Sequence, residues 1–103
     1  MMSQQQLLFK QQLTISQILR EHGKRYRQIQ SQYSDGHSGR CALGVIMSYY
    51  GWNGKDDSQA TRKLLNTLIA LRCAGIDKNL IIEMNDSGFT FDEIAAYLDS
   101  VSK

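Results

Sequence analysis

The 103-residue sequence contains no proline, only two cysteines and no long run of apolar residues. Without proline the chain lacks the strongest helix breaker, so glycines and capping residues must end its helices. Cys41 and Cys73 show no Cys-x-x-Cys spacing, which argues against a disulfide framework and against a four-ligand zinc site. We therefore expect two reduced, structural thiols, no metal site and no cofactor.

No segment has the composition of a membrane span or a secretion signal. The longest stretch free of charged residues lies between Cys41 and Lys55, and about half of it is polar or glycine. A spanning helix needs roughly 20 consecutive apolar residues. The N-terminus lacks the basic region and the apolar core of a signal peptide. We expect a protein that makes no membrane contact and stays in the cytoplasm.

The length and composition are those of one small globular domain spanning residues 1–103. Hydrophobic residues make up 42% of the chain and charged residues 21%, which is enough for one modest core. The net charge of +2 is unevenly placed, because residues 1–50 hold six Lys or Arg against two acids and residues 51–103 hold six against eight. A dedicated nucleic-acid binder usually carries a larger positive charge, although a local basic patch could still act.

Helical periodicity predicts an all-α fold, a compact bundle of about five short helices. The first helix is expected from Gln4 to Glu21, with residues 1–5 frayed and an end at His22-Gly23. Residues 24–39 are rich in glycine, serine and histidine, so they predict a long loop with a helical turn near Tyr26 to Gln32.

The segment from Arg40 to Tyr50 predicts the buried central helix of this bundle. It is apolar on two stripes at once, and a helix that is apolar all round is a buried one. Gly44 costs about 0.8 to 1 kcal/mol relative to alanine inside a helix. We expect that a neighbouring helix or loop approaches the backbone closely at Gly44 and compensates this cost.

Three further helices complete the prediction. Ser58 is a suitable N-cap for a helix from Gln59 to Ala74. A short helix follows from about Asp77 to Met84, and Thr90 and Glu93 form a capping box for a last helix that reaches Val101. The side chains expected to point inward from the helix after Ser58 are Leu64, Leu65, Leu68, Ile69 and Cys73. No segment alternates with a period of two, so no strand is predicted.

Two short segments carry a resemblance. Residues 39–44 have the sequence Gly-Arg-Cys-Ala-Leu-Gly, and residues 85–95 begin with an Asn-Asp-Ser-Gly turn before an amphipathic helix. In these segments the chain resembles small, functionally uncharacterised helical proteins that pair a Cys-Ala-Leu-Gly segment with such a turn. The resemblance implies no activity, cofactor or substrate, but it singles out Cys41, Asn85 and Asp86 as candidate ligand-binding residues.

Cys41 is also the one candidate for catalysis. A thiolate at a helix N-terminus is stabilised by the helix dipole, and His37 and Arg40 lie close by in the sequence. The apolar residues around Cys41 favour a structural thiol instead. The turn at Asn85-Asp86 does not fit a calcium loop, because the position that requires a glutamate falls on Ile94. Asn and Asp also favour the backbone of a plain helix-ending turn.

A basic stretch near the first glycine is the candidate nucleic-acid site. It combines four cations with an aromatic ring that could stack on a base, namely Arg20, Lys24, Arg25, Tyr26 and Arg27. We do not favour a helix-turn-helix at the C-terminus, because only five residues follow Leu98, too few for a recognition helix. A solvated loop with scattered charge is the simpler interpretation of the basic stretch.

The leading functional hypothesis is a non-catalytic protein-interaction module, self-association included. Its candidate interface is an exposed surface around Tyr49, Tyr50 and Trp52, since Trp and Tyr are frequent interface anchors. Weak electrostatic binding of nucleic acid and a cysteine-dependent activity at Cys41 are the alternatives.

Overall fold

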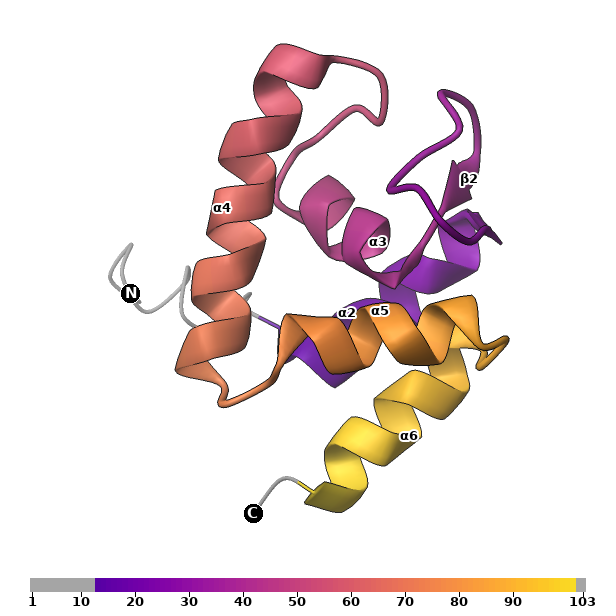
Figure 1. Cartoon of the computed structure of the whole chain (residues 1–103), viewed down its shortest axis with the longest axis vertical. Helices are drawn as coiled ribbons and strands as arrows, with labels where there is room; N and C mark the ends of the chain where they lie inside the picture. Colours follow the sequence, from indigo (N-terminus) through magenta and orange to yellow (C-terminus); the bar gives the residue numbers. More distant parts are fainter. Residues whose placement is uncertain (1–12, 102–103) are drawn as a thin grey trace, which may run out of the picture.

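The computed structural model describes residues 13–101, and 63% of this part is helical. Five helices form a compact unit with a small two-stranded sheet on one side (Figure 1). The prediction of a mostly helical fold is confirmed, whereas the sheet was not predicted. No helix among these residues is both long and apolar enough to cross a membrane. The elements in chain order are α2 (Ile15–His22), η1 (Gly23–Arg25), β1 (Arg27–Gln28), β2 (Gly39–Arg40), α3 (Ala42–Tyr49), α4 (Asp57–Cys73), α5 (Lys78–Asp86) and α6 (Phe91–Val101).

Helix α2 begins later than the periodicity predicts. The Thr14 side chain accepts a hydrogen bond from the Gln17 backbone N–H, and the Gln17 side chain accepts one from the Thr14 N–H. This capping box holds Thr14 in an extended conformation. The expectation that Thr14 lies inside a helix is therefore wrong. The predicted end at Gly23 is confirmed. The rest of the predicted first helix, with its frayed start, lies outside the described residues.

Residues 23–40 contain regular structure that the sequence did not reveal. Strands β1 and β2 pair in parallel, with Arg27 opposite Gly39 and Gln28 opposite Arg40. The helical turn expected near Tyr26 to Gln32 is wrong, because the turn lies earlier, in η1, and Tyr26 is extended. A strand of two residues is too short to show a period of two in the sequence.

Helix α3 is buried along its first six residues, from Ala42 to Met47. It contacts α2, α4 and α5, and Cys41 forms its N-cap. The expected close approach at Gly44 is confirmed, because a Cβ atom there would overlap the carbonyl oxygen of Tyr33. The approaching element is the loop between β1 and β2. Only glycine leaves room for it at this position.

Helix α4 is less buried than predicted. Its N-cap is Asp56 rather than Ser58, since the Asp56 carboxylate accepts a hydrogen bond from the Ser58 N–H. Only Thr67 and Leu71 are fully buried in α4. The inward placement of Leu65, Ile69 and Cys73 is wrong, because Leu65 is 56% exposed, Ile69 is 53% exposed and Cys73 is exposed. The apolar residues of α4 cover two adjacent sides of the helix, and only one of these sides packs against the rest of the described chain.

Helix α6 follows the sequence pattern closely, whereas α5 extends two residues past its predicted end at Met84. The expectation that Asn85 and Asp86 lie in the turn is wrong, because both belong to the last turn of α5. Asp77 caps α5, and both hydrogen bonds of the predicted capping box between Thr90 and Glu93 are present at α6. Helix α6 packs mainly against α2 and also touches α5. The turn between α5 and α6 brings residues 85–89 beside the loop that follows β1 (Figure 1).

Candidate functional site

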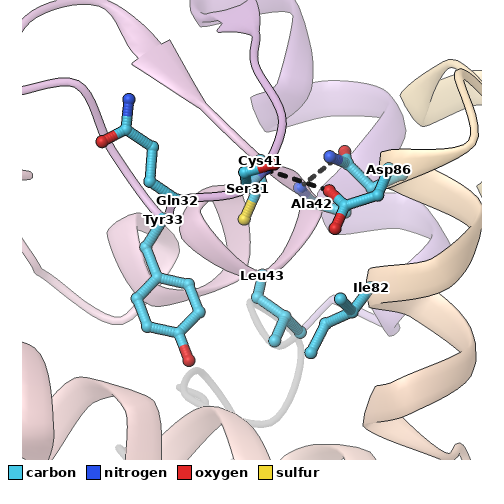
Figure 2. A pocket seen from close by; sticks show the side chains of 9 residues that line it. Ser31, Gln32, Tyr33, Cys41, Ala42, Leu43, Ile82 and Asp86 are labelled. Carbon is cyan, nitrogen blue, oxygen red and sulfur yellow. Dashed lines mark hydrogen bonds between the residues drawn. The ribbon is translucent and has the colours of Figure 1, made fainter.

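A cavity of about 400 Å³ lies between the loop after β1, the start of α3 and the end of α5 (Figure 2). The three candidate ligand-binding residues, Cys41, Asn85 and Asp86, all line it. Cys41 and Asn85 are 44 positions apart in the sequence, so the fold is what brings them together. Cavities of this volume lie within the range of small-molecule binding sites.

The wall of the cavity is largely apolar. Leu43 from α3 and Ile82 from α5 contribute aliphatic side chains, and the ring of Tyr33 contributes an aromatic face (Figure 2). Tyr33 is 36% exposed and Asp86 is exposed, so the cavity opens at the protein surface. An apolar group that enters the cavity would therefore leave water for an apolar surface.

Asn85 fixes the geometry of the cavity, and the oxygen and the nitrogen of its side chain both have hydrogen-bond partners. Its side-chain oxygen accepts hydrogen bonds from the Ala42 N–H at 3.0 Å and from Gln28 Nε2 at 2.8 Å. Its side-chain nitrogen donates to the Ile29 carbonyl oxygen at 2.8 Å. Asn85 is only 1% exposed. It therefore acts as a positioning residue that ties α5 to α3 and to the loop after β1.

Gln28 is a second positioning residue, and no pattern in the sequence indicated it. Its Nε2 also donates to the Phe89 carbonyl oxygen at 2.7 Å, and its Oε1 accepts the Phe91 N–H at 3.1 Å. Gln28 thus satisfies one of the backbone N–H groups that a helix start leaves without a partner. Its partners lie more than 50 residues away along the chain, where no local pattern can indicate them.

Asp86 is the one charged side chain on the cavity wall. It is the last residue of α5, and its Oδ1 accepts a hydrogen bond from the Ser31 N–H at 3.1 Å. Ser31 has a φ of +68°, the only positive value for a residue other than glycine between residues 13 and 101. Such a conformation costs on the order of 1 kcal/mol. The bond to Asp86 helps to hold Ser31 in it.

Cys41 has the properties of a structural thiol. Its side chain is 8% exposed, and its sulfur accepts the Gly44 N–H at 3.4 Å as the cap of α3. Burial raises the pKa of the Cys41 thiol, and the nearby charge of Asp86 raises it further, against the lowering effect of the hydrogen bond from Gly44. A reactive cysteine needs a lowered pKa. Within the described chain, no group of three or more His, Cys, Asp or Glu side chains could hold a metal ion.

Arg40 is held away from Cys41 in a polar network of its own. It is 4% exposed, and its guanidinium lies over the ring of Tyr26, 4.6 Å from the ring centre, with Trp52 at 5.8 Å. The four acceptors closest to the guanidinium nitrogens belong to Ser34, His37, Gly39 and Ser48. No acidic side chain within residues 13–101 pairs with Arg40. The guanidinium thus organises the loop before α3 and does not activate the thiol.

The structure divides the basic stretch. Arg20 pairs with Asp99, and Arg27 pairs with Asp35 at 2.6 Å. Tyr26 is half-buried, and the Arg40 guanidinium covers one face of its ring. Lys24 and Arg25 are exposed in η1 without an ion pair to any residue between 13 and 101. The five residues do not form one cationic surface.

The three aromatic interface candidates are packed rather than displayed. Trp52 is 7% exposed and donates its indole N–H to the Asp56 carbonyl oxygen at 3.0 Å, so the expectation of an exposed Trp52 is wrong. Tyr49 and Tyr50 are half-buried and meet edge to face. The Tyr49 hydroxyl accepts the Leu13 N–H at 3.2 Å. These three aromatic side chains therefore pack within the described chain.

No family model, no curated protein and no solved structure matches this chain. The assignment of a function therefore depends on the geometry of the cavity.

Proposed function

We propose that this protein is a non-catalytic, cytoplasmic protein-interaction module that receives an apolar side chain of its partner in the cavity beside Cys41. The observation that carries the proposal is an apolar-walled cavity of about 400 Å³ that includes Leu43 and Ile82 and opens at the surface. Binding pockets in proteins are mostly apolar, with a few polar groups that fix orientation. This cavity has that composition.

The buried network behind the cavity supports a binding role. Asn85 and Gln28 join three segments through hydrogen bonds of 2.7 to 3.1 Å, so the cavity walls are held in place before a partner arrives. A preformed pocket lowers the entropy cost of association. In this proposal α3 is the buried centre of the helical bundle, and its first turn forms the floor against which the partner side chain packs.

The thiol chemistry supports binding rather than catalysis. Burial raises the pKa of Cys41, and neither His22 nor His37 lines the cavity. A cysteine nucleophile needs a base within hydrogen-bond reach or a lowered pKa. In the proposed function Cys41 contributes apolar surface and the cap of α3.

A titration of the full chain with N-isopentylacetamide tests this function. The compound joins a leucine-like group to an amide, and we expect shifts of backbone amide NMR signals in residues 31–33, 41–43 and 82–86 with a Kd of about 1 to 10 mM. The variant Ile82→Gln should weaken binding at least about fivefold, which corresponds to one lost apolar contact of about 1 kcal/mol. Leu65→Gln, which alters an exposed side chain on α4 outside the cavity, should leave binding unchanged. If no signal around the cavity shifts, the proposed function is wrong.

Self-association is a second form of this function, favoured by one observation. Leu65 and Ile69 lie four residues apart on α4 and are both more than half exposed. Residues at this spacing share one face of a helix. Light scattering should then give the mass of a dimer for the unchanged chain and the mass of a monomer for the double variant Leu65→Lys with Ile69→Lys. A monomer mass for the unchanged chain at high concentration would contradict it.

A further inference from the structure

The rim of the cavity carries negative charge and no positive charge. Among the residues that line it, Asp86 is the only one with a formal charge, and no Lys or Arg lines the wall. Within the described part of the chain Asp86 forms no ion pair, and its hydrogen bond with Ser31 uses only Oδ1. The other carboxylate oxygen is left for solvent or for a ligand.

The position of Asp86 in α5 adds to the negative potential. The C-terminal end of a helix carries a partial negative charge, which favours cations there and disfavours carboxylates. Asp86 is the last residue of α5, and the last turn of this helix contains no basic residue. Glu83, exposed and one turn earlier, has the same sign. A carboxylate at this place costs stability unless a positive charge from outside the described chain offsets it.

Two locally unfavourable features therefore meet at the same rim. The left-handed Ser31 and the carboxylate at the end of α5 are joined by a hydrogen bond. Sequences break local rules most often where a function requires it. Both features line the cavity, where a ligand could reach them.

We propose that the partner segment carries a lysine or arginine directly beside its apolar anchor, and that its cationic group pairs with Asp86 while the apolar side chain fills the cavity. This inference rests on the proposed function and adds the chemical class of the partner: a peptide segment with an adjacent apolar and basic residue. The apolar wall and the carboxylate both belong to one cavity. One short peptide segment can therefore reach both.

Three acetylated, amidated peptides that differ at one position test the pairing: Gly-Leu-Lys-Gly, Gly-Leu-Gln-Gly and Gly-Leu-Glu-Gly. Each is titrated into the full chain at low salt and followed by backbone amide NMR shifts. We expect the lysine peptide to bind about fivefold more tightly than the glutamine peptide, the size of one exposed ion pair. The glutamate peptide should bind most weakly, and added salt should reduce the differences.

Two variants assign the effect to a residue. Asp86→Asn removes the charge but keeps an oxygen that can accept the Ser31 N–H, so the rim keeps its shape. It should bind the lysine and glutamine peptides equally. Asp92→Asn removes an exposed carboxylate of α6 that does not line the cavity, and it should preserve the fivefold preference.

The outcomes separate the two proposals. If no peptide shifts the signals around the cavity, the proposed function fails together with this inference. If all three peptides bind the unchanged chain equally well, the cavity binds apolar groups but the pairing with Asp86 is wrong. A lysine preference that survives in Asp86→Asn also overturns the pairing, because another group must then provide it.

Discussion

Helices α3 and α4 are in contact but differ in how they are held. Helix α3 has 8 residues and buries its first six, whereas α4 has 17 residues and fully buries only Thr67 and Leu71. The ends of α3 are fixed by polar bonds, with Asn85 on the Ala42 N–H and Arg40 bound to Ser48. Helix α4 is about twice as long, yet the shorter α3 is the more deeply buried helix and is the one held at both ends by polar contacts.

Removing Arg40 should produce the largest loss of stability. Arg40→Met keeps the length of the side chain but removes the charged donor that serves the oxygens of Ser34, His37, Gly39 and Ser48. Hydrogen bonds to a charged group contribute about 1.5 to 3 kcal/mol each, and the Ser34 and Gly39 oxygens keep a second, backbone donor. We therefore expect the free energy of unfolding to fall by about 4 kcal/mol in urea denaturation. The matched control is Arg27→Met. The Arg27 side chain is 63% exposed in its ion pair with Asp35, so the loss should stay below about 1 kcal/mol. Equal losses in both variants would show that the buried network does not distinguish α3.

Asn85→Ala should come next. The substitution leaves the Ala42 N–H and the Ile29 carbonyl oxygen without their partner, which should lower the free energy of unfolding by about 3 kcal/mol. The neighbouring variant Asp86→Asn retains an acceptor for Ser31 and should change stability by less than about 0.5 kcal/mol. Both values come from urea denaturation. If Asp86→Asn were the more damaging change, Asp86 would be structural and the proposed pairing would lose its basis.

Two leucines of α4 allow buried and exposed positions to be compared within one helix. Leu71 is 1% exposed and Leu65 is 56% exposed. Leu71→Ala should cost about 2 kcal/mol, the lower end for a buried leucine, because a half-exposed helix can relax around the loss. Leu65→Ala should cost less than about 0.5 kcal/mol. Equal, large losses would mean that the exposed face of α4 is covered in solution.

The contrast between α3 and α4 also explains which features of the fold could be predicted from the sequence. The helix end at Gly23, the capping box at Thr90 and the close approach at Gly44 depend on local patterns or on one residue type, and all three were correct. Periodicity in α4 identified the helix but could not tell which of two apolar faces has a neighbour. The predicted inward side chains were therefore partly wrong.

The cavity could be predicted only in part. The Cys-Ala-Leu-Gly segment and the Asn-Asp turn drew attention to Cys41, Asn85 and Asp86, and these residues do line one cavity. Their separate roles were hidden, because the partners of Asn85 lie 43 to 57 residues away in the chain. Long-range polar contacts leave no periodic signal. The burial of Arg40 was hidden for the same reason, since arginine is usually an exposed residue.

Substitutions of the two cysteines should have the smallest effect on stability. The reactivity of the two thiols compares the burial of α3 and α4 directly. Cys73 at the end of α4 is exposed and Cys41 at the start of α3 is buried, so a thiol reagent should label Cys73 much faster in the native protein. Burial raises the pKa of Cys41, so in the folded protein its thiol stays protonated at a pH where the unfolded chain has ionised. Its contribution to stability is complete below about pH 8.5, the pKa of an ordinary thiol, and is lost as the pH rises through the higher folded-state pKa.

Cys41→Ser provides the control for this pH dependence, because serine does not titrate in this range. Urea midpoints measured between about pH 7 and 10 should fall more steeply for the unchanged chain than for Cys41→Ser. Cys73→Ser should follow the unchanged chain, since Cys73 is exposed. Parallel curves for all three proteins, together with rapid labelling of Cys41, would indicate that the start of α3 opens readily. In that case α3 would be no more firmly held than α4, and the cavity would not be preformed.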